Sequence, residues 1–403
     1  MTKKILIITD NLADQINGVV TTYKNIEPYA ARDGYSIDYI NPRRYFYVDC
    51  PKYNEVKLVF PKGLEKTIQE IRPDHIHIAT EGFLGLFARR YLTIRGISYN
   101  TAYHTKFPEA IKKLFGVPEM FTWPLIRWFH SNSNAVLTTT KSMVEELKSH
   151  GFGNNVVPWT RGVDRGIFKP AERKANEKLV LLNVGRVSKE KNLEQFYKID
   201  YPNCQKIQVG DGPMLKEYIK RYPDVNFVGA KRGAELAYYY QQADVFVFPS
   251  RTDTFGLVLL EAMGCGLPVA AFPVTGPIDV VGDSGAGALD DDLEKGCLEA
   301  LKIDRKTVRM HAETFSWAAA TDLFFGHLTK CRKSPHSYMI SENPHKTNHG
   351  ISRVFAAAKN SLAGLLYAIR EESAFRQELL LAMLLIPLAF VVPSTLLEKI
   401  IML

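Results

Sequence analysis

The most informative stretch of the sequence is Ser250-Arg-Thr-Asp-Thr-Phe-Gly-Leu-Val-Leu-Leu-Glu-Ala-Met-Gly-Cys-Gly-Leu-Pro-Val269. Asp253 precedes a Phe-Gly turn, and the helical stretch that follows Gly256 carries a second carboxylate, Glu261. Free N–H groups at a helix start attract anions, and Glu261 lies about one turn beyond Leu257 on the same face. The stretch therefore predicts a phosphate site with a carboxylate beside it that could hold sugar hydroxyls.

Short apolar runs alternate with helical stretches in two series along the chain, which predicts parallel sheets. The first series comprises residues 5–8, 37–40, 57–60, 75–79, 97–103 and 135–139. The second comprises residues 179–184, 206–209, 225–228, 245–248 and 268–272. Two such sheets would place the carboxyl ends of their strands at a cleft, where ligands bind. The predicted fold class is therefore α/β, with two facing Rossmann-like domains.

A basic loop precedes this stretch in the second series and reads Asn183-Val-Gly-Arg-Val-Ser-Lys-Glu-Lys-Asn192. Gly185 would allow close backbone approach, Arg186 suits bidentate contact with a phosphate, and Lys191 acts as a point charge. By itself the loop could be an ordinary solvated basic segment. Its position ahead of residues 253–261 favours phosphate binding.

Length and composition limit the number of domains, the partners and the location that we expect for the protein. A chain of 403 residues predicts two domains with additional segments. The net charge of +8 indicates either attraction to anionic headgroups and phosphates or simply a basic soluble enzyme. We expect no nucleic-acid partner, because no RNA-binding motif or zinc-finger spacing is present. Five scattered cysteines and a short apolar N-terminal run favour the cytosol and argue against disulfides or a zinc site.

Several ordered motifs together resemble those of the retaining glycosyltransferase family 4, whose members have the GT-B fold. The matching pieces are Asn17-Gly-Val-Val20, Tyr103-His-Thr-Lys106, Arg161-Gly-Val-Asp164, Gly185-Arg186 with Lys191, Gly210-Asp-Gly-Pro213, and the pair Asp253 and Glu261. The family usually has Glu at the first position of that pair. The resemblance covers about residues 1–330 and includes a helix after Phe315-Ser-Trp317 that crosses back to the first domain.

The resemblance implies a role for each matching residue of the second domain. Arg186 and Lys191 would bind the diphosphate of a UDP- or GDP-linked sugar, and Glu261 would bind the ribose. Asp253 would hold the sugar, and its shorter side chain puts the identity of that sugar in question. The backbone that would hold the sugar and phosphate belongs to Phe255, Gly256, Leu257 and Val258.

Two residues of the first domain complete the implied site. Gly18 would let its loop approach the donor phosphates, and His104 would lie near the transferred sugar, although a lone histidine is often structural. The resemblance implies retention of configuration without a metal or cofactor. No protein nucleophile is evident, so we expect front-face displacement in which the leaving phosphate takes the acceptor proton.

Beyond the second series the composition of the chain changes twice, first at a polar linker and then at an apolar tail. The predicted domains are 1–165 on the acceptor side, 166–312 for the nucleotide sugar, a crossover helix at 313–330, a linker at 331–350 and a tail at 351–403. The linker contains His336, His345 and His349, whose spacing does not indicate a metal site.

The tail has an amphipathic segment at 351–370 and an apolar run at 379–392. That run is short for a full membrane span, and the tail could instead dock on the soluble domains. Residues 350–403, with Ala374-Phe-Arg-Gln-Glu378, resemble the N-terminal part of bacterial diacylglycerol kinase. The resemblance stops before that family's later helices, so we expect no kinase activity. It implies a helical, membrane-associated tail at the cytoplasmic face of the inner membrane.

These patterns predict an enzyme that transfers a hexose or uronic acid to a membrane lipid, with diacylglycerol as the first candidate. Residues 80–85 and the aromatic, basic stretch 107–129 would form walls for the acceptor, although the second could be a core helix. Three alternatives stay open. They are a GDP-mannose-dependent α-mannosyltransferase for another lipid or saccharide, a lipid kinase fused to a glycosyltransferase-like module, and a non-catalytic membrane-binding module.

Overall fold

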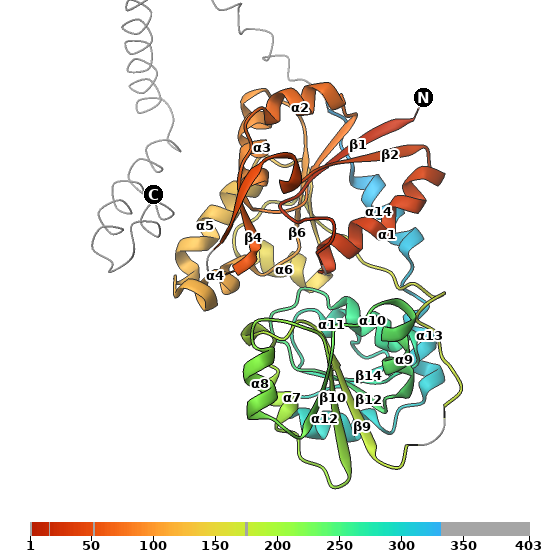
Figure 1. Cartoon of the computed structure of the whole chain (residues 1–403). Helices are drawn as coiled ribbons and strands as arrows, with labels where there is room; N and C mark the ends of the chain where they lie inside the picture. Colours follow the sequence, from red (N-terminus) through yellow and green to blue (C-terminus); the bar gives the residue numbers. More distant parts are fainter. Residues whose placement is uncertain (1, 16, 51–52, 174–175, 332–403) are drawn as a thin grey trace, which may run out of the picture. The chain divides into compact units, whose positions relative to one another are not determined.

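The computed structural model describes residues 2–15, 17–50, 53–173 and 176–331, which form two lobes (Figure 1). Each lobe contains a six-stranded sheet whose paired strands all run parallel. This confirms the predicted α/β class with two Rossmann-like sheets. The linker beyond residue 331, its histidines and the tail at 351–403 lie outside the described residues.

The sheet of the N-terminal lobe has the strand order β2-β1-β5-β6-β7-β8. Its strands are β1 (Lys3–Ile8), β2 (Tyr35–Ile40), β5 (His75–Ile78), β6 (Asn100–Tyr103), β7 (Val136–Thr138) and β8 (Val156–Pro158). The register pairs Ile5 with Ile37 on one side and with His75 on the other. Residues 5–8 are fully buried, as expected for a central strand covered on both faces.

One predicted parallel strand is wrong. Residues 57–60 belong to β4 (Tyr53–Phe60), which pairs antiparallel with β3 (Phe46–Cys50) in a separate two-stranded sheet. Within β4, Val59 is buried whereas its neighbour Phe60 is 57% exposed. A strand buried on only one face suits an antiparallel hairpin better than the middle of a parallel sheet.

Helices cover both faces of the N-terminal sheet. They are α1 (Gly18–Arg32), α2 (Leu64–Ile71), α3 (Phe83–Ile94), α4 (Phe107–Phe115), α5 (Glu119–His130) and α6 (Lys141–Ser149), with a 3₁₀ turn at Pro42–Arg44. One core cluster packs against α2 and α3, and another packs against α1. The predicted stretch 107–129 is two helices, because Gly116 ends α4 and Pro118 precedes α5.

The C-terminal lobe has the strand order β11-β10-β9-β12-β13-β14. Its strands are β9 (Leu179–Val184), β10 (Cys204–Val209), β11 (Val225–Gly229), β12 (Val245–Phe248), β13 (Val269–Ala271) and β14 (Gly287–Leu289). From β9 the chain adds β10 and then β11 on one side of the sheet. It then returns to the other side of β9 and adds β12, β13 and β14. This reversal opens a crevice at the carboxyl ends of β9 and β12, where parallel sheets bind ligands.

Helices flank this second sheet (Figure 1), with a separate core cluster on each of its faces. The helices α7 (Glu194–Tyr197), α8 (Leu215–Arg221) and α12 (Leu293–Ala300) cover one face. The helices α9 (Gly233–Gln242), α10 (Leu257–Gly264) and α13 (Arg305–Ala312) cover the other. A 3₁₀ turn at Lys189–Lys191 and the short α11 (Pro277–Val280) complete the lobe.

The last described helix, α14 (Trp317–His327), packs on the N-terminal lobe. The indole N–H of Trp159 donates to the Ala320 carbonyl at 2.8 Å, and Phe324 stacks on the Trp159 ring with centroids 4.8 Å apart. Lys330 then forms an antiparallel bridge with His75 at the amino end of β5. The chain thus returns to the lobe in which it began.

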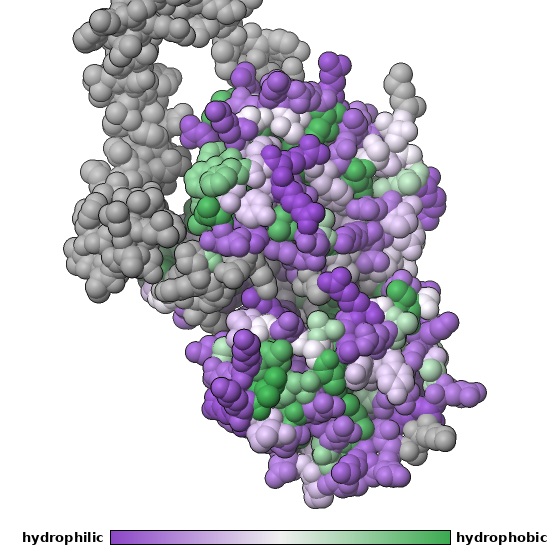
Figure 2. Space-filling view, in the orientation of Figure 1, coloured by the Kyte–Doolittle hydropathy of each residue, from purple (hydrophilic) through white to green (hydrophobic). Residues whose placement is uncertain are grey.

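The face of the described part that Figure 2 shows mixes polar and apolar side chains. Large apolar side chains are exposed on α3 and α5, including Phe87 at 49%, Met120 at 71% and Phe121 at 64%. Within the described ranges, no helix combines the length and the apolar character needed to cross a bilayer.

We predict that Gly162→Ala weakens the docking of α14. A Cβ atom at residue 162 would lie 2.2 Å from the Trp317 nitrogen, so the backbone of either segment must move. Such overpacking costs about 1–3 kcal/mol, which thermal unfolding would detect as a lower melting temperature. The control is Gly326→Ala on α14, where a Cβ meets nothing within 4 Å and helix propensity favours Ala. Equal melting temperatures for Gly162→Ala and the wild type would contradict the packing described.

Candidate functional site

Two loops meet at the carboxyl ends of β9 and β12. The first carries Arg186 and Lys191, and the second carries Asp253. The Lys191 ammonium lies 2.5 Å from an Asp253 carboxylate oxygen, with both side chains about three-quarters buried. Asn192 has a left-handed backbone and donates from its side chain to the Pro249 carbonyl at 3.1 Å. The Lys191 charge is therefore fixed beside the β12 loop.

The Gly-Asp-Gly-Pro segment after β10 supports the β9 loop from behind. The Val187 N–H donates to the Asp211 carbonyl at 2.9 Å, and the Val187 carbonyl accepts from the Met214 N–H at 3.0 Å. A Cβ atom at Gly210 would lie 1.9 Å from the Gly185 carbonyl oxygen. The glycine at 210 is thus required by close backbone packing.

The amino ends of α1 and α10 approach one another from the two lobes. Gly256 precedes α10 with a left-handed φ of 80°, and no side chain caps that helix. At the start of α1, a Cβ atom added at Gly18 would lie 3.7 Å from a methyl group of Leu257. The Asn17 side chain accepts from the Val20 N–H at the start of α1, so it is the uncapped start of α10 that directs partial positive charge toward the interface between the lobes. Of the predicted residues 255–258, the structure places Leu257 next to Gly18.

Glu261 lies one turn into α10 and is held by the hydroxyl of Tyr240, which donates to it at 2.9 Å. Burial raises the pKa of Glu261 to about 7, and the hydrogen bond from Tyr240 partly opposes that rise. Further hydrogen-bond donors would stabilise the ionised form of Glu261, because a buried carboxylate that ionises without them has a large desolvation cost.

His104, directly after β6, is engaged by protein groups at both ring nitrogens. The Arg161 guanidinium donates to its Nδ1 at 2.9 Å, and its Nε2 lies 3.0 Å from the Tyr23 hydroxyl. Because arginine only donates, Nδ1 must be the acceptor, and neutral His104 carries its proton on Nε2. The Tyr23 hydroxyl can then donate to Nε2 of His77, 2.7 Å away. The sequence predicts a sugar contact for His104 but did not foresee this chain of bonds.

Arg161 is a buried cation at the centre of this chain, with only 2% of its surface exposed. It stacks over Trp159 at 4.2 Å and donates to the Trp159 and Thr160 carbonyls. Burial lowers the pKa of Arg161 to about 10, and burial together with the Arg161 charge holds the pKa of His104 well below its ordinary value. Among the described residues no carboxylate pairs with Arg161, so its charge acts on its surroundings.

Direct hydrogen bonds join the two lobes around the site. The Thr254 hydroxyl donates to the His104 carbonyl at 2.6 Å, and the Thr254 carbonyl accepts from the Thr139 hydroxyl at 2.6 Å. Farther along, Asp279 accepts from the Ser142 N–H at the start of α6 at 3.0 Å. Sequence reasoning missed these contacts, because a threonine that bonds backbone in another lobe leaves no local pattern.

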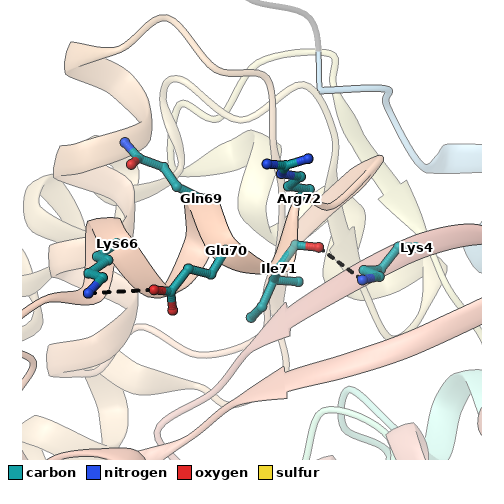
Figure 3. Close-up of a pocket in the computed structure, with 6 residues that line it drawn as sticks. All are labelled: Lys4, Lys66, Gln69, Glu70, Ile71 and Arg72. Carbon is teal, nitrogen blue, oxygen red and sulfur yellow. Dashed lines mark hydrogen bonds and ion pairs between the residues drawn. The ribbon is translucent and has the colours of Figure 1, made fainter.

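Other candidate sites are weaker. Across the described residues, no group of three or more His, Cys, Asp or Glu side chains could hold a metal ion. An open hollow of about 630 Å³ lies at the amino end of β1, where the Lys4 ammonium donates to the Ile71 carbonyl and Lys66 pairs with Glu70 (Figure 3). This is the opposite end of the sheet from the site. The hollow is lined by Lys4, Lys66, Gln69, Glu70, Ile71 and Arg72.

Three family models match successive parts of the chain. Glycosyltransferase Family 4 matches residues 16–166, and Glycosyl transferases group 1 matches residues 164–307. Prokaryotic diacylglycerol kinase matches residues 359–403, as expected for the tail.

Curated relatives extend this match to most of the chain. Sulfoquinovosyl transferase SQD2 of Arabidopsis thaliana is 30% identical over 80% of this chain and 67% of its own length. A GDP-mannose-dependent alpha-mannosyltransferase of Corynebacterium glutamicum is 28% identical over 72% of this chain and 77% of its own. Alpha-monoglucosyldiacylglycerol synthase of Streptococcus pneumoniae is 25% identical over 74% of this chain and 78% of its own.

Solved structures share the fold. Sucrose-phosphate synthase from Thermosynechococcus elongatus aligns with a TM-score of 0.68 over 80% of this chain and 98% of its own, at 18% identity. At 18% identity, this similarity shows a shared fold.

We predict that the proton on Glu261 makes stability depend on pH. The pKa of Glu261 is about 7 in the folded protein against 4.5 ordinarily, so the folded state retains a proton that the unfolded chain releases. The wild type should therefore lose about 3 kcal/mol relative to Glu261→Gln as pH rises from about 4.5 to 7. Melting temperatures across this range test it, with Glu217→Gln, an exposed change on the same lobe, as control. Parallel profiles for wild type and Glu261→Gln would contradict it.

Proposed function

The chain belongs to glycosyltransferase family 4, and on that premise we propose that it transfers a hexose or a uronic acid from a nucleotide sugar to diacylglycerol. The observation that carries the proposal is that Lys191 pairs with Asp253 just ahead of α10, whose start has no side-chain cap and lies against the start of α1 in the other lobe. A diphosphate is the anion that such an array suits. Sequence similarity to enzymes named for glycolipid products supports a lipid acceptor.

In the proposed complex, Arg186, Lys191 and the N–H groups at the start of α10 hold the diphosphate. Glu261 accepts hydrogen bonds from the ribose hydroxyls, for which its buried carboxylate is suited. Asp253 turns from Lys191 toward the sugar once the diphosphate binds that lysine. The C-terminal lobe, residues 166–312, is then the donor domain, and residues 1–165 form the acceptor domain with the 313–330 segment as the crossover.

The reaction that we propose retains configuration and uses no metal. The bond between the anomeric carbon and the diphosphate breaks, and the acceptor oxygen bonds to that carbon on the same face. The acceptor proton passes to the departing phosphate oxygen. Lys191, Arg186 and the helix N–H groups stabilise the negative charge that develops on the phosphate. His104, polarised by Arg161, faces the sugar with a neutral ring.

A lipid acceptor would place the proposed reaction at a membrane surface. The apolar side chains exposed on α3 and α5 give the N-terminal lobe a surface that could meet lipid. Residues 359–403, which match the diacylglycerol kinase model, would hold the enzyme at the cytoplasmic face of the inner membrane. The net charge of +8 favours anionic lipid. We propose no nucleic-acid partner.

A second candidate is GDP-mannose-dependent transfer to another lipid or to a saccharide, which similarity to the Corynebacterium glutamicum enzyme favours. The decisive experiment incubates the full chain with UDP-glucose, UDP-glucuronate or GDP-mannose and vesicles that contain diacylglycerol. A new glycolipid from a UDP-sugar is the expected product. Product only from GDP-mannose would favour the second candidate. No product from folded protein that binds nucleotide would contradict transfer to diacylglycerol from these sugars.

We predict that Lys191→Ala lowers kcat/KM by about 100-fold, the order of loss seen when one preorganised oxyanion donor is removed. The change removes a cation and also leaves the Asp253 carboxylate beside the diphosphate without its partner. Thermal shift with UDP and GDP would measure the lost binding directly. Lys198→Ala removes an exposed lysine on the same lobe, paired with Glu194, and should behave as wild type. Unchanged nucleotide affinity in Lys191→Ala would show that the donor site lies elsewhere.

A further inference from the structure

A tyrosine–glutamate pair lies in the C-terminal lobe, at the carboxylate that the proposed function assigns to the ribose. Tyr240 is on α9 and Glu261 is on the neighbouring α10, and the Tyr240 hydroxyl donates to Oε2 of Glu261 at 2.9 Å. Tyr240 has no exposed surface, whereas Glu261 is partly exposed. One member of the pair therefore belongs to the core, and the other reaches the surface of the lobe.

The core fixes the position of the Tyr240 hydroxyl. The Tyr240 ring makes edge contacts with Phe246 of β12 and with Phe168, at centroid distances of 5.6 and 5.9 Å. The same core cluster contains Leu260 and Met263 of α10. Close packing of this kind holds a side chain in one rotamer, so the hydroxyl donates to Glu261 from a defined place.

The second oxygen of the Glu261 carboxylate is available to a ligand. Among the described residues, the Tyr240 hydroxyl is the only donor to this carboxylate, and Oε1 is not closed off from solvent. A carboxylate oxygen carries two lone pairs, which is enough to accept from both hydroxyls of a ribose. Tyr240 thus leaves one oxygen bonded to the core and the other open.

The hydrogen bond from Tyr240 also favours the ionised form of Glu261. Burial raises the pKa of Glu261 to about 7, and the bond from Tyr240 acts in the opposite direction. Burial, and after it the Glu261 charge, raises the pKa of Tyr240 well above its ordinary value, so the hydroxyl keeps its proton and stays a donor. Without that donor the pKa of Glu261 would be higher still, and the carboxyl group would be mostly protonated at neutral pH.

Other half-buried charged side chains on the helices packed against α10 bond elsewhere. Three of them, on α13, donate to backbone carbonyls, and one, on α11, accepts from the start of α6; they are Arg305, Arg309, His311 and Asp279. At the end of α10, burial and after it the Glu261 charge raise the pKa of the Cys265 thiol to about 12, so this thiol stays neutral. Among the described residues, Tyr240 is therefore the group that opposes the effect of burial on Glu261.

We propose that Tyr240 is a positioning residue of the donor site, which holds Glu261 ionised with one oxygen left for the ribose of the nucleotide sugar. This inference rests on the proposed function and deepens it, because it makes recognition of the ribose depend on pH. An ionised carboxylate accepts a hydrogen bond from a hydroxyl more strongly than a neutral carboxyl group does. Ribose recognition should therefore strengthen as pH rises through the pKa of Glu261.

The test compares ribose nucleotides with deoxyribose nucleotides. Isothermal titration of the full chain gives Kd for UDP, GDP and their 2′-deoxy forms between about pH 5.5 and about pH 9. The ratio of Kd for the deoxy form to Kd for the ribose form isolates the ribose contact, because both carry the same base and phosphates. In the wild type we expect this ratio to rise about tenfold, with its midpoint near pH 7.

Two variants and a matched control test the pair. Tyr240→Phe keeps the ring and removes the donor, so the midpoint should move up by about one pH unit and the ratio should approach that of the wild type at about pH 9. Glu261→Gln cannot ionise and should give a ratio that does not change with pH. Tyr222→Phe is the control, because it removes a hydroxyl that donates to Glu194 at 3.1 Å on the other face of the same sheet, and it should follow the wild type throughout.

The outcomes separate this inference from the proposed function. A wild-type midpoint in Tyr240→Phe, or a ratio lowered equally at every pH as structural damage would cause, would overturn the role of Tyr240 alone. The same holds for a wild type that binds nucleotide with a ratio independent of pH. A folded wild type that binds neither UDP nor GDP would overturn the proposed donor site and this inference with it.

Discussion

The spacing of the two lobes depends on Thr254, which bonds the N-terminal lobe through both its side chain and its backbone. Its partners, His104 and Thr139, follow neighbouring strands, so the contact ties the carboxyl ends of the two sheets together. Asp253 and Phe255 flank the threonine in the chain. The contact between the lobes therefore lies next to the residues of the proposed sugar position, with a further bond between Ser142 and Asp279.

The charged groups around the site fall into a positive and a negative set. On one side lie Arg186, Lys191 and two helix amino ends, with the uncompensated charge of Arg161 behind His104. On the other side lie the carboxylates around Tyr103.

The sequence predicted the parallel strands of each lobe better than the contacts between the lobes. Continuous apolar runs such as residues 5–8 mark central parallel strands, because both faces of such strands are covered. Residues 57–60 gave a similar signal, but the exposure of Phe60 shows that only one face is buried. Gly18, Lys191 and Glu261 could each be assigned to the segment that follows a particular strand, because the order of the motifs along the chain identifies that strand. The bonds of Thr254 join segments more than a hundred residues apart, and no local spacing encodes them.

The described chain ends at Cys331, whose N–H bonds to the Asp74 carbonyl just before β5 begins. The proposed substrate contacts all follow the carboxyl ends of strands, so this exit lies at the far edge of the parallel sheet from them. The bridge between Lys330 and His75 thus fixes the point at which the two-lobe body continues into the rest of the chain, and that point is at the amino ends of the strands.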